Sequence, residues 1–314
     1  MARTGVEYSI SYGKAAISVY RTYARPLVGV PAIPESPFTG RSNNLFACEI
    51  AVEVFGNDFL PAYTEGDNRN VVATDTMKNF VLQQALAYEG ATLEGLLHFL
   101  GAQFLAIYPG MERLRLMGSE IPFDGVPVPN AGDGAFGASE TLFSRSHNSA
   151  AHATLIVARD GADVAVTAHE CGCTNLQLIK LTGSSFARFA RDAYTTLPEM
   201  VDRPLFIYCD IAWTYTDVAD MLAANPARYI PAEQVRDCAR AVFHQFVSKS
   251  IQHLVHEIGR LLLERFPQMA TVSFAAQNRL WDPAFTAEAD PKRKVYTDPR
   301  PPYGTIRLTL ERER

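Results

Sequence analysis

Two places where a predicted strand passes into a predicted helix carry residue types that could bind an anion. The first is Thr74-Asp75-Thr76, ahead of a helical apolar pattern that starts at Met77, and the second is Ser184-Ser185-Phe186. The first N–H groups of a helix have no partner inside it, and the helix dipole is positive there, so a negative ligand is stabilised. The same side chains also cap ordinary helices. Each junction is therefore a candidate anion site, with simple capping as the alternative.

Three isolated polar residues could extend such a site. Lys14 lies where the alternation of the first predicted strand, residues 8–21, changes phase, which predicts a turn or bulge. Arg203 stands just before a predicted strand, and Gln252 lies within a long predicted helix. Taken one at a time, each has an ordinary alternative: a solvated lysine, a surface ion pair and an exposed helical glutamine.

The elements that must position these residues follow the same order twice. Alternating and apolar runs predict strands, then capped helices, then strands in each half of the chain. In the second half we expect a helix from near Phe186 and one long helix from Pro231. Three prolines, a glycine and a Ser-Asn-Asn cluster predict a loop over 30–45. The pattern predicts an α+β chain of two tandem units, residues 1–150 and 151–314.

The composition argues against several classes of partner. The 314 residues carry a formal net charge of -5 with both signs mixed, so nucleic acid is not expected. The longest apolar stretch, Leu93 to Ile107, is short and interrupted by polar residues, so no membrane span is expected. The N-terminus lacks the apolar core of a signal peptide, the other end lacks Ser-Lys-Leu, and the five cysteines are sparse. We expect a cytoplasmic protein with reduced thiols.

Five motifs, in order along the chain, resemble the urate oxidase (uricase) family. They are Tyr12-Gly13-Lys14, the segment from Gly66 to Asn79, the block from Leu178 to Arg203, Ser250-Ile251-Gln252, and the C-terminal region from Val272 through Asn278 to Ile306. The resemblance covers nearly the whole chain. It implies a tunnelling fold (T-fold) of two tandem units, whose antiparallel sheets carry helices on one face. It also implies a homotetramer, in which four chains form a barrel and the sites lie at subunit interfaces.

The resemblance assigns one edge of a purine to the second half of the chain. Phe186 would stack on the flat ring, and Arg203 and Gln252, with Ile251 beside them, would hold one edge of it. A planar guanidinium and an amide can hydrogen-bond neighbouring carbonyl and N–H groups of a urate anion.

The opposite edge and the chemistry are implied for other residues. Thr74 and the backbone N–H of Asp75 would bind the second edge of the ring, at a helix N-terminus. Lys14 and Thr74 would form the catalytic proton relay, and Asn278 would lie with Thr74 beside the dioxygen site.

One residue departs from the family pattern. The family usually has Pro-Asn-x-His where this chain has Gln277-Asn278-Arg279-Leu280, so Leu280 takes the place of the relay histidine beside dioxygen. A leucine side chain neither donates nor accepts a proton. Loss of one relay member commonly costs a factor of about a hundred or more when proton transfer limits the rate.

We identify no metal or flavin signature, including H-E-x-x-H or a pair of C-x-x-C motifs, and expect no cofactor and no metal. This suits a family in which the substrate anion itself passes electrons to dioxygen while the protein binds, orients and stabilises charge. The resemblance then implies oxidation of urate to 5-hydroxyisourate with release of hydrogen peroxide.

Two alternatives remain open at this point. Leu280 makes the space above the ring less polar, which would suit a modified purine or another fused bicyclic heterocycle in specialised metabolism. A purine-binding protein without catalysis, or a zinc-dependent T-fold enzyme, is the other alternative. Zinc would need more ligands than the one close cluster, His253, His256 and Glu257.

Overall fold

Alternate apolar positions in eight segments of the chain produce one antiparallel sheet. The computed structural model describes residues 6–130, 132, 134–145, 147–161 and 163–313. Within these residues the strands pair in the order β1-β4-β5-β8-β9-β10-β11-β14. Their bounds are β1 (Tyr12–Thr22), β4 (Leu45–Phe55), β5 (Arg113–Glu120), β8 (Ala150–Asp160), β9 (Asp163–Lys180), β10 (Leu205–Tyr215), β11 (Met269–Arg279) and β14 (Gly304–Glu311).

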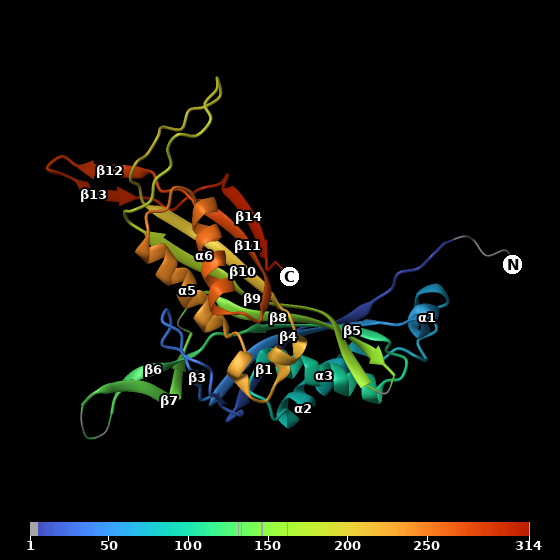
Figure 1. Cartoon of the computed structure of the whole chain (residues 1–314). Coiled ribbons are helices and arrows are strands. Elements are labelled where there is room, and N and C mark those ends of the chain that lie inside the picture. The colour runs from blue at the N-terminus through green and yellow to red at the C-terminus, as the bar shows by residue number, and fades with distance from the viewer. Residues whose placement is uncertain (1–5, 131, 133, 146, 162, 314) are drawn as a thin grey trace.

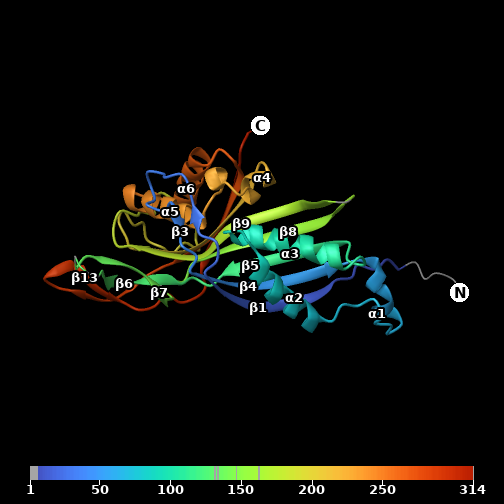
Figure 2. The same ribbon diagram turned by 90° about the horizontal axis from the view of Figure 1, so that it is seen from below.

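Four long helices cover one face of this sheet, α2 and α3 over its first half and α5 and α6 over its second (Figure 1, Figure 2). The sheet residues beneath them, such as Ile50, Leu116 and Leu155, are fully buried. Burying each such side chain contributes about 1.5–3 kcal/mol. The expected α+β architecture, with helices on one face, is confirmed. The helices are α2 (Thr74–Ala87), α3 (Leu93–Ile107), α5 (Ala232–Gln245) and α6 (Ile251–Arg265).

A glycine in the middle of α3 and another in the middle of α6 let these helices approach the sheet closely. A β-carbon on Gly101 would lie 2.6 Å from Val157 Cγ2, and one on Gly259 would lie 2.4 Å from Leu310 Cδ1. The two halves of the chain therefore pack their second helix in the same way.

Each long helix also ends on a basic side chain from the sheet, which satisfies carbonyl groups at the negative end of the helix dipole. Arg21 of β1 donates to carbonyls at the end of α2, and Arg159 of β8 to those at the end of α3. Lys180 of β9 donates to carbonyls at the end of α5, and Arg312, just after β14, donates to carbonyls at and after the end of α6. The order of these contacts repeats from the first half to the second.

This repetition suggests where the two units meet. β8 supplies the basic residue for α3 of the first half, whereas β9 supplies the one for α5 of the second. We propose that the boundary lies between β8 and β9, somewhat later than position 150.

The phase change in the first strand is confirmed. The pairing of β1 with β4 shifts between Lys14 and Ile17, and Ala16 has a positive φ of 56°. Gly13 is required just before the shift, because a β-carbon there would lie 1.9 Å from the carbonyl oxygen of Val52. The bulge therefore sets the direction of the strand end that carries Lys14.

The helix expected from near Phe186 is absent, so that prediction was wrong. Residues 181–204 contain no helix, and their backbone groups find partners in other segments instead. The N–H of Phe186 donates to Met200 O, and that of Arg203 donates to Ser184 O. Ser184 and Ser185 therefore do not form a helix N-terminus, and the second candidate anion site is not of that kind.

The single long helix expected from Pro231 was also wrong. α5 ends at Gln245, and α6 begins at Ile251 after an N-cap at Ser250. The break follows from the side chain of Ser250, whose hydroxyl accepts a hydrogen bond from His253 N at 3.1 Å. Gln252 consequently lies in the first turn of α6 rather than in a helix interior.

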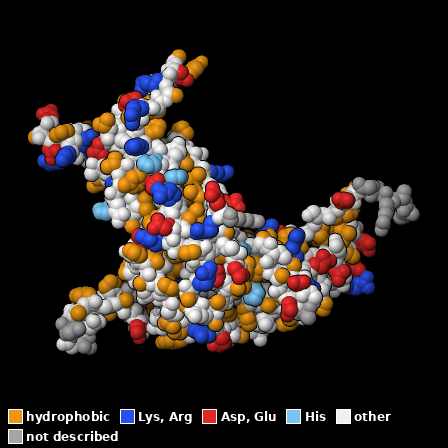
Figure 3. Space-filling model, viewed as in Figure 1, with side chains coloured by type: hydrophobic (Ala, Val, Ile, Leu, Met, Phe, Trp, Pro, Cys, Tyr) orange, Lys and Arg blue, Asp and Glu red, His pale blue; other side chains and the backbone are white. Residues whose placement is uncertain are grey.

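Three arms project from the main body (Figure 1). They are the β6–β7 hairpin, the β12–β13 hairpin and the segment 181–204. Hydrophobic side chains are visible on the projecting parts of the surface in Figure 3. The large apolar side chains that the three arms expose are Phe136, Leu142, Tyr194, Val201, Phe285 and Val295. The remaining elements are β2 (Leu27–Val28), β3 (Gly40–Arg41), η1 (Asn57–Phe59), α1 (Leu60–Thr64), β6 (Asp124–Pro129), β7 (Phe136–Ser144), α4 (Val218–Leu222), η2 (Pro226–Arg228), β12 (Pro283–Ala287) and β13 (Asp290–Tyr296). None of the helices in the described residues has the length and apolar character to cross a membrane.

Candidate active site

A buried arginine with no acidic partner in the described residues marks the part of the site in the second half of the chain. Arg203 is 6% exposed, and its guanidinium carbon lies 5.3 Å from the centre of the Phe186 ring. Its Nε is buried and has no hydrogen-bond partner within the described residues. Burial lowers the pKa of this group, because no neighbouring carboxylate compensates for the lost hydration. A charge in this state is stabilised by an anionic ligand.

The Phe186 ring is supported from its own segment. Phe189 stacks on it with ring centres 4.9 Å apart and an angle of 13° between the planes. One face of Phe186 is therefore covered by a second aromatic ring, which restricts its orientation.

Two buried serines connect this segment to the start of α6. Ser248 Oγ donates to Ser184 Oγ at 3.0 Å, and Ser185 N donates to Ser248 O at 2.8 Å. The carbonyl of Ser184 accepts from Arg203 N at 2.8 Å. Arg203 and the connection that leads into α6 are thus joined by one short set of hydrogen bonds.

Ile251, Gln252 and Asn278 have different environments next to these serines. Ile251 is 4% exposed, while Gln252 is exposed and makes no side-chain hydrogen bond within the described residues. Asn278 lies near the end of β11, and its Oδ1 is buried without a partner in the described part of the chain. Two amide side chains and one guanidinium therefore have hydrogen-bonding capacity left for a ligand.

The two residues after Asn278 have no proton-relay chemistry of their own. The guanidinium carbon of Arg279 lies 3.6 Å from the centre of the Tyr303 ring and 4.3 Å from that of Tyr208. Leu280 is 40% exposed. Neither residue offers a group that exchanges protons near neutral pH.

The other part of the site is at the start of α2. The helix begins at Thr74, its N-cap Ala73 has no capping side chain, and no described side chain accepts from its first N–H groups. The pKa of the exposed Asp75 carboxyl is lowered, chiefly by a hydrogen bond from Lys78 and also by the charge of Lys14. The structure therefore brings Lys14 close to a free helix N-terminus, as an anion site requires.

Within one chain these two parts lie apart. α2 covers the first half of the sheet, whereas the segment 181–204 and α6 belong to the second (Figure 1). The predicted site residues therefore form two separate groups within the chain.

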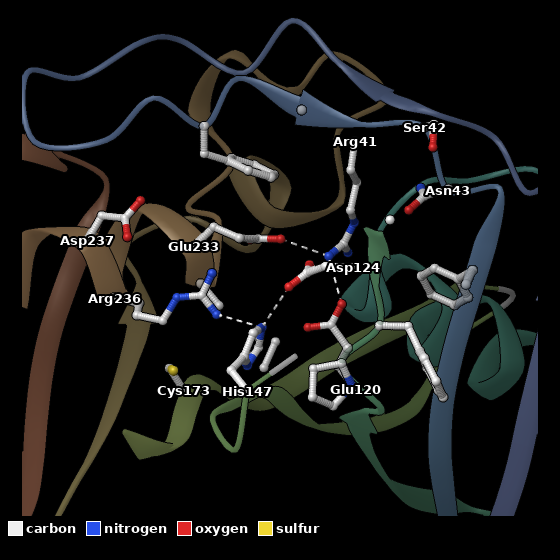
Figure 4. Close-up of a pocket in the computed structure, with 18 of the residues that line it drawn as sticks. Arg41, Ser42, Asn43, Glu120, Asp124, His147, Cys173, Glu233, Arg236 and Asp237 are labelled. Atoms are coloured by element: carbon white, nitrogen blue, oxygen red, sulfur yellow. Dashed lines mark hydrogen bonds and ion pairs between the residues drawn. The ribbon is translucent and has the colours of Figure 1, made fainter. Parts of the chain in front are cut away.

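A cavity of about 870 Å³ lies elsewhere, beneath the 30–45 loop (Figure 4). There Arg41 bridges Glu120 and Glu233, each at 2.9 Å, and Arg236 donates to His147 Nε2 at 3.1 Å. These contacts tie the loop to β5 and α5. None of the predicted site residues lines the cavity.

The candidate zinc ligands on α6 make contacts with other side chains of the protein. The His253 ring packs edge-on against Phe246 with centres 5.1 Å apart, and His256 lies 3.0 Å from Glu257. Among the described residues no three His, Cys, Asp or Glu side chains gather as a metal site would require.

One glycine pattern in the sequence matches a nucleotide-binding motif but does not form one. Gly132, Gly134 and Gly137 have the G-x-G-x-x-G spacing of nucleotide-binding loops. Gly137 is in β7, and the described residues between β6 and β7 include no helix that could bind a phosphate.

The fold, one antiparallel sheet with helices on one face, is that of the T-fold class. Comparison with known proteins gives the family. The family model described as Uricase matches residues 169–307. The uricase of Halalkalicoccus jeotgali is 46% identical over 96% of this chain and 98% of its own length. The chain belongs to the uricase (urate oxidase) family.

Further relatives agree with this assignment. The uric acid degradation bifunctional protein PucL of Bacillus subtilis is 44% identical over 99% of this chain, which spans only 62% of that longer relative. The crystal structure of Bacillus sp. TB-90 urate oxidase superimposes with a TM-score of 0.92 at 44% identity, over 97% of this chain and 100% of the other.

Proposed function

We propose that this protein oxidises urate with dioxygen, giving 5-hydroxyisourate and hydrogen peroxide. Urate loses two electrons to dioxygen, which becomes hydrogen peroxide, and water supplies the hydroxyl group added to the ring. The observation that carries the proposal is Arg203, a buried guanidinium that has no acidic partner in the described residues and lies next to the half-buried ring of Phe186, in a member of this family.

The binding residues would act by holding the ring. Phe186 stacks on it, while Arg203 and Gln252, beside Ile251, grip one edge with charge-assisted and amide hydrogen bonds. Thr74 and the N–H of Asp75 bind the opposite edge at the start of α2. Holding the substrate in this way removes much of the entropic cost of reaction.

The proton transfers would fall to Lys14 and Thr74. Dioxygen lies beside Asn278 and Thr74, with Leu280 in place of the family's histidine. The relay in this protein then works through the lysine and threonine alone. The apolar side chain of Leu280, 40% exposed, favours a second candidate substrate, a purine alkylated on the ring.

We further propose a homotetramer with sites at its subunit interfaces. The separation of α2 from the segment 181–204 supports this, as do the strands β1 and β14, which each have one unpaired edge within the described sheet. Joining such edges between chains closes a barrel. All five cysteines are free and buried, which supports a cytoplasmic location.

The test is to incubate the purified protein with urate in air while recording urate absorbance and hydrogen peroxide. We expect equal loss of urate and gain of peroxide. Lys14→Met should lower kcat about a hundredfold or more, and Arg203→Ala should abolish saturable binding. No turnover of urate, together with turnover of an alkylated purine, would transfer the proposal to the second substrate. No reaction with either would refute it.

A further inference from the structure

The connection between α5 and α6 is held by a lysine that no predicted site role uses. Lys180, the last residue of β9, donates from Nζ to Phe243 O and Phe246 O, each at 2.8 Å, and to His244 O at 3.3 Å. Its three N–H groups are thereby matched by three carbonyls at the negative end of α5. It has no ion pair with a carboxylate in the described residues.

This contact does more at α5 than the corresponding arginines do at the other helices. α2, α3 and α6 each also end with a backbone N–H of the C-cap residue bonded back into the helix. The C-cap of α5, Phe246, makes no such bond within the described residues. Lys180 is therefore the main hydrogen-bonding tie at the end of α5.

The path of the lysine side chain runs under the substrate-binding segment. A β-carbon on Gly183 would lie 3.1 Å from Lys180 Cε and 3.3 Å from its Nζ, so the glycine leaves room for the chain to pass. Gly183 O in turn accepts from Ser248 N at 3.2 Å. The five residues 246–250 are thus fixed at one end by Lys180 and in the middle by residues 183–185.

Those five residues lead directly to the start of α6. Ser248 is bonded to Ser184, whose carbonyl holds Arg203, and Ser250 caps the helix turn that carries Gln252. Any movement of this connection would change the position of Gln252 relative to Arg203. We propose that Lys180 is a positioning residue for urate binding, which sets the spacing of the Arg203 and Gln252 grip through the α5–α6 connection.

The inference rests on the proposed function, and the experiment separates the two. The full-length protein is compared with Lys180→Met and Lys180→Arg. The matched control is Arg159→Met, which removes an equivalent cap from α3, a helix that carries no predicted site residue. Urate binding is measured without oxygen, so that affinity is read apart from turnover, and amide hydrogen exchange is followed over residues 246–252.

We expect Lys180→Met to speed amide hydrogen exchange in residues 246–252. Urate binding should weaken about tenfold, which corresponds to the loss of one hydrogen bond between the protein and the ring. In air its KM should rise by a similar factor, with kcat changed much less, because the loss falls on ground state and transition state alike. Lys180→Arg should recover most of the affinity. Arg159→Met should lower the melting temperature with urate affinity unchanged.

Two results would overturn the proposal. Unchanged exchange in 246–252 would show that Lys180 does not hold the connection. Faster exchange with unchanged urate affinity would show that its role is only structural. If the unaltered protein itself failed to bind urate, the proposed function would be wrong. The hydrogen-exchange data would still show whether Lys180 holds the α5–α6 connection. Lys180→Gln, which keeps two donors, replaces the methionine variant if that variant does not fold.

Discussion

The guanidinium of Arg203 is buried beside an aromatic ring, and its charge is costly there until an anion arrives. Its planar fork matches adjacent acceptors on one edge of a ring, which a lysine cannot do. Arg203→Lys should therefore weaken urate binding about tenfold or more although the charge is kept. Calorimetry without oxygen measures this. The control is Arg188→Lys, an exposed arginine of the same segment, and equal losses in both variants would contradict the prediction.

A buried carboxyl away from the site makes stability depend on pH. Glu94 of α3 is 5% exposed, and Tyr229 OH donates to its Oε2 at 2.9 Å. Burial raises the pKa of Glu94. The folded state then binds this proton more tightly than the unfolded state, so the stabilisation is complete below the unfolded pKa and is lost as pH rises through the folded pKa.

Glu94→Gln should abolish this dependence while keeping an acceptor for Tyr229. The gain in stability of Glu94→Gln over the unaltered protein should be larger at pH 8 than at pH 5, by about 1–2 kcal/mol. The difference in melting temperature between the two proteins should be larger at pH 8 accordingly. Scanning fluorimetry at the two pH values gives the comparison. Glu89→Gln, at an exposed position, should show no such difference. The same shift at both pH values for Glu94→Gln would rule out the explanation.

At the scale of elements, the start of α6 links stability to binding. Ser250→Ala removes the cap bond to His253 N and should cost about 1 kcal/mol of helix stability. Because Gln252 lies in the first turn, the KM for urate should rise as well. Thr92→Ala removes the equivalent cap of α3, where Thr92 Oγ accepts from Gly95 N at 3.2 Å. The Thr92→Ala control should lower the melting temperature and leave the KM for urate unchanged. A rise in KM in both variants would point to a global effect.

At the scale of the whole molecule, the separation of the half-sites predicts complementation between inactive chains. Lys14→Met damages the half-site at α2, and Arg203→Ala damages the half-site near α6. In mixed oligomers some interfaces combine the intact half of each chain. With random mixing about a quarter of the sites should be intact, so activity should return to about that fraction. Mixing after co-expression or refolding, followed by a urate assay, tests this. Persistent inactivity of well-mixed oligomers would place both half-sites in one chain.

The sequence by itself determined the features that depend on local pattern. Alternation gave most of the strands and the bulge after Gly13, because side chains in a strand change faces at every residue. The apolar period of α2 and α3 marked those helices, and the ordered motifs identified the family. The roles of Lys14, Thr74 and Gln252 remain predictions, although the structure shows an open helix N-terminus at the second of them.

Tertiary structure decided where helices form and end at positions where the local sequence pattern favours more than one structure. Ser184 and Ser185 have the residue types of a helix cap, yet both bond to Ser248, over sixty residues along the chain. Ser185 does so through its backbone N–H and Ser184 through its hydroxyl, and no helix forms at Phe186. The connection between α5 and α6 is held by the same contact and by Lys180, and Ser250 caps the start of α6. Partners so distant in the sequence leave no local period, because their pairing exists only once the sheet has brought the two segments together.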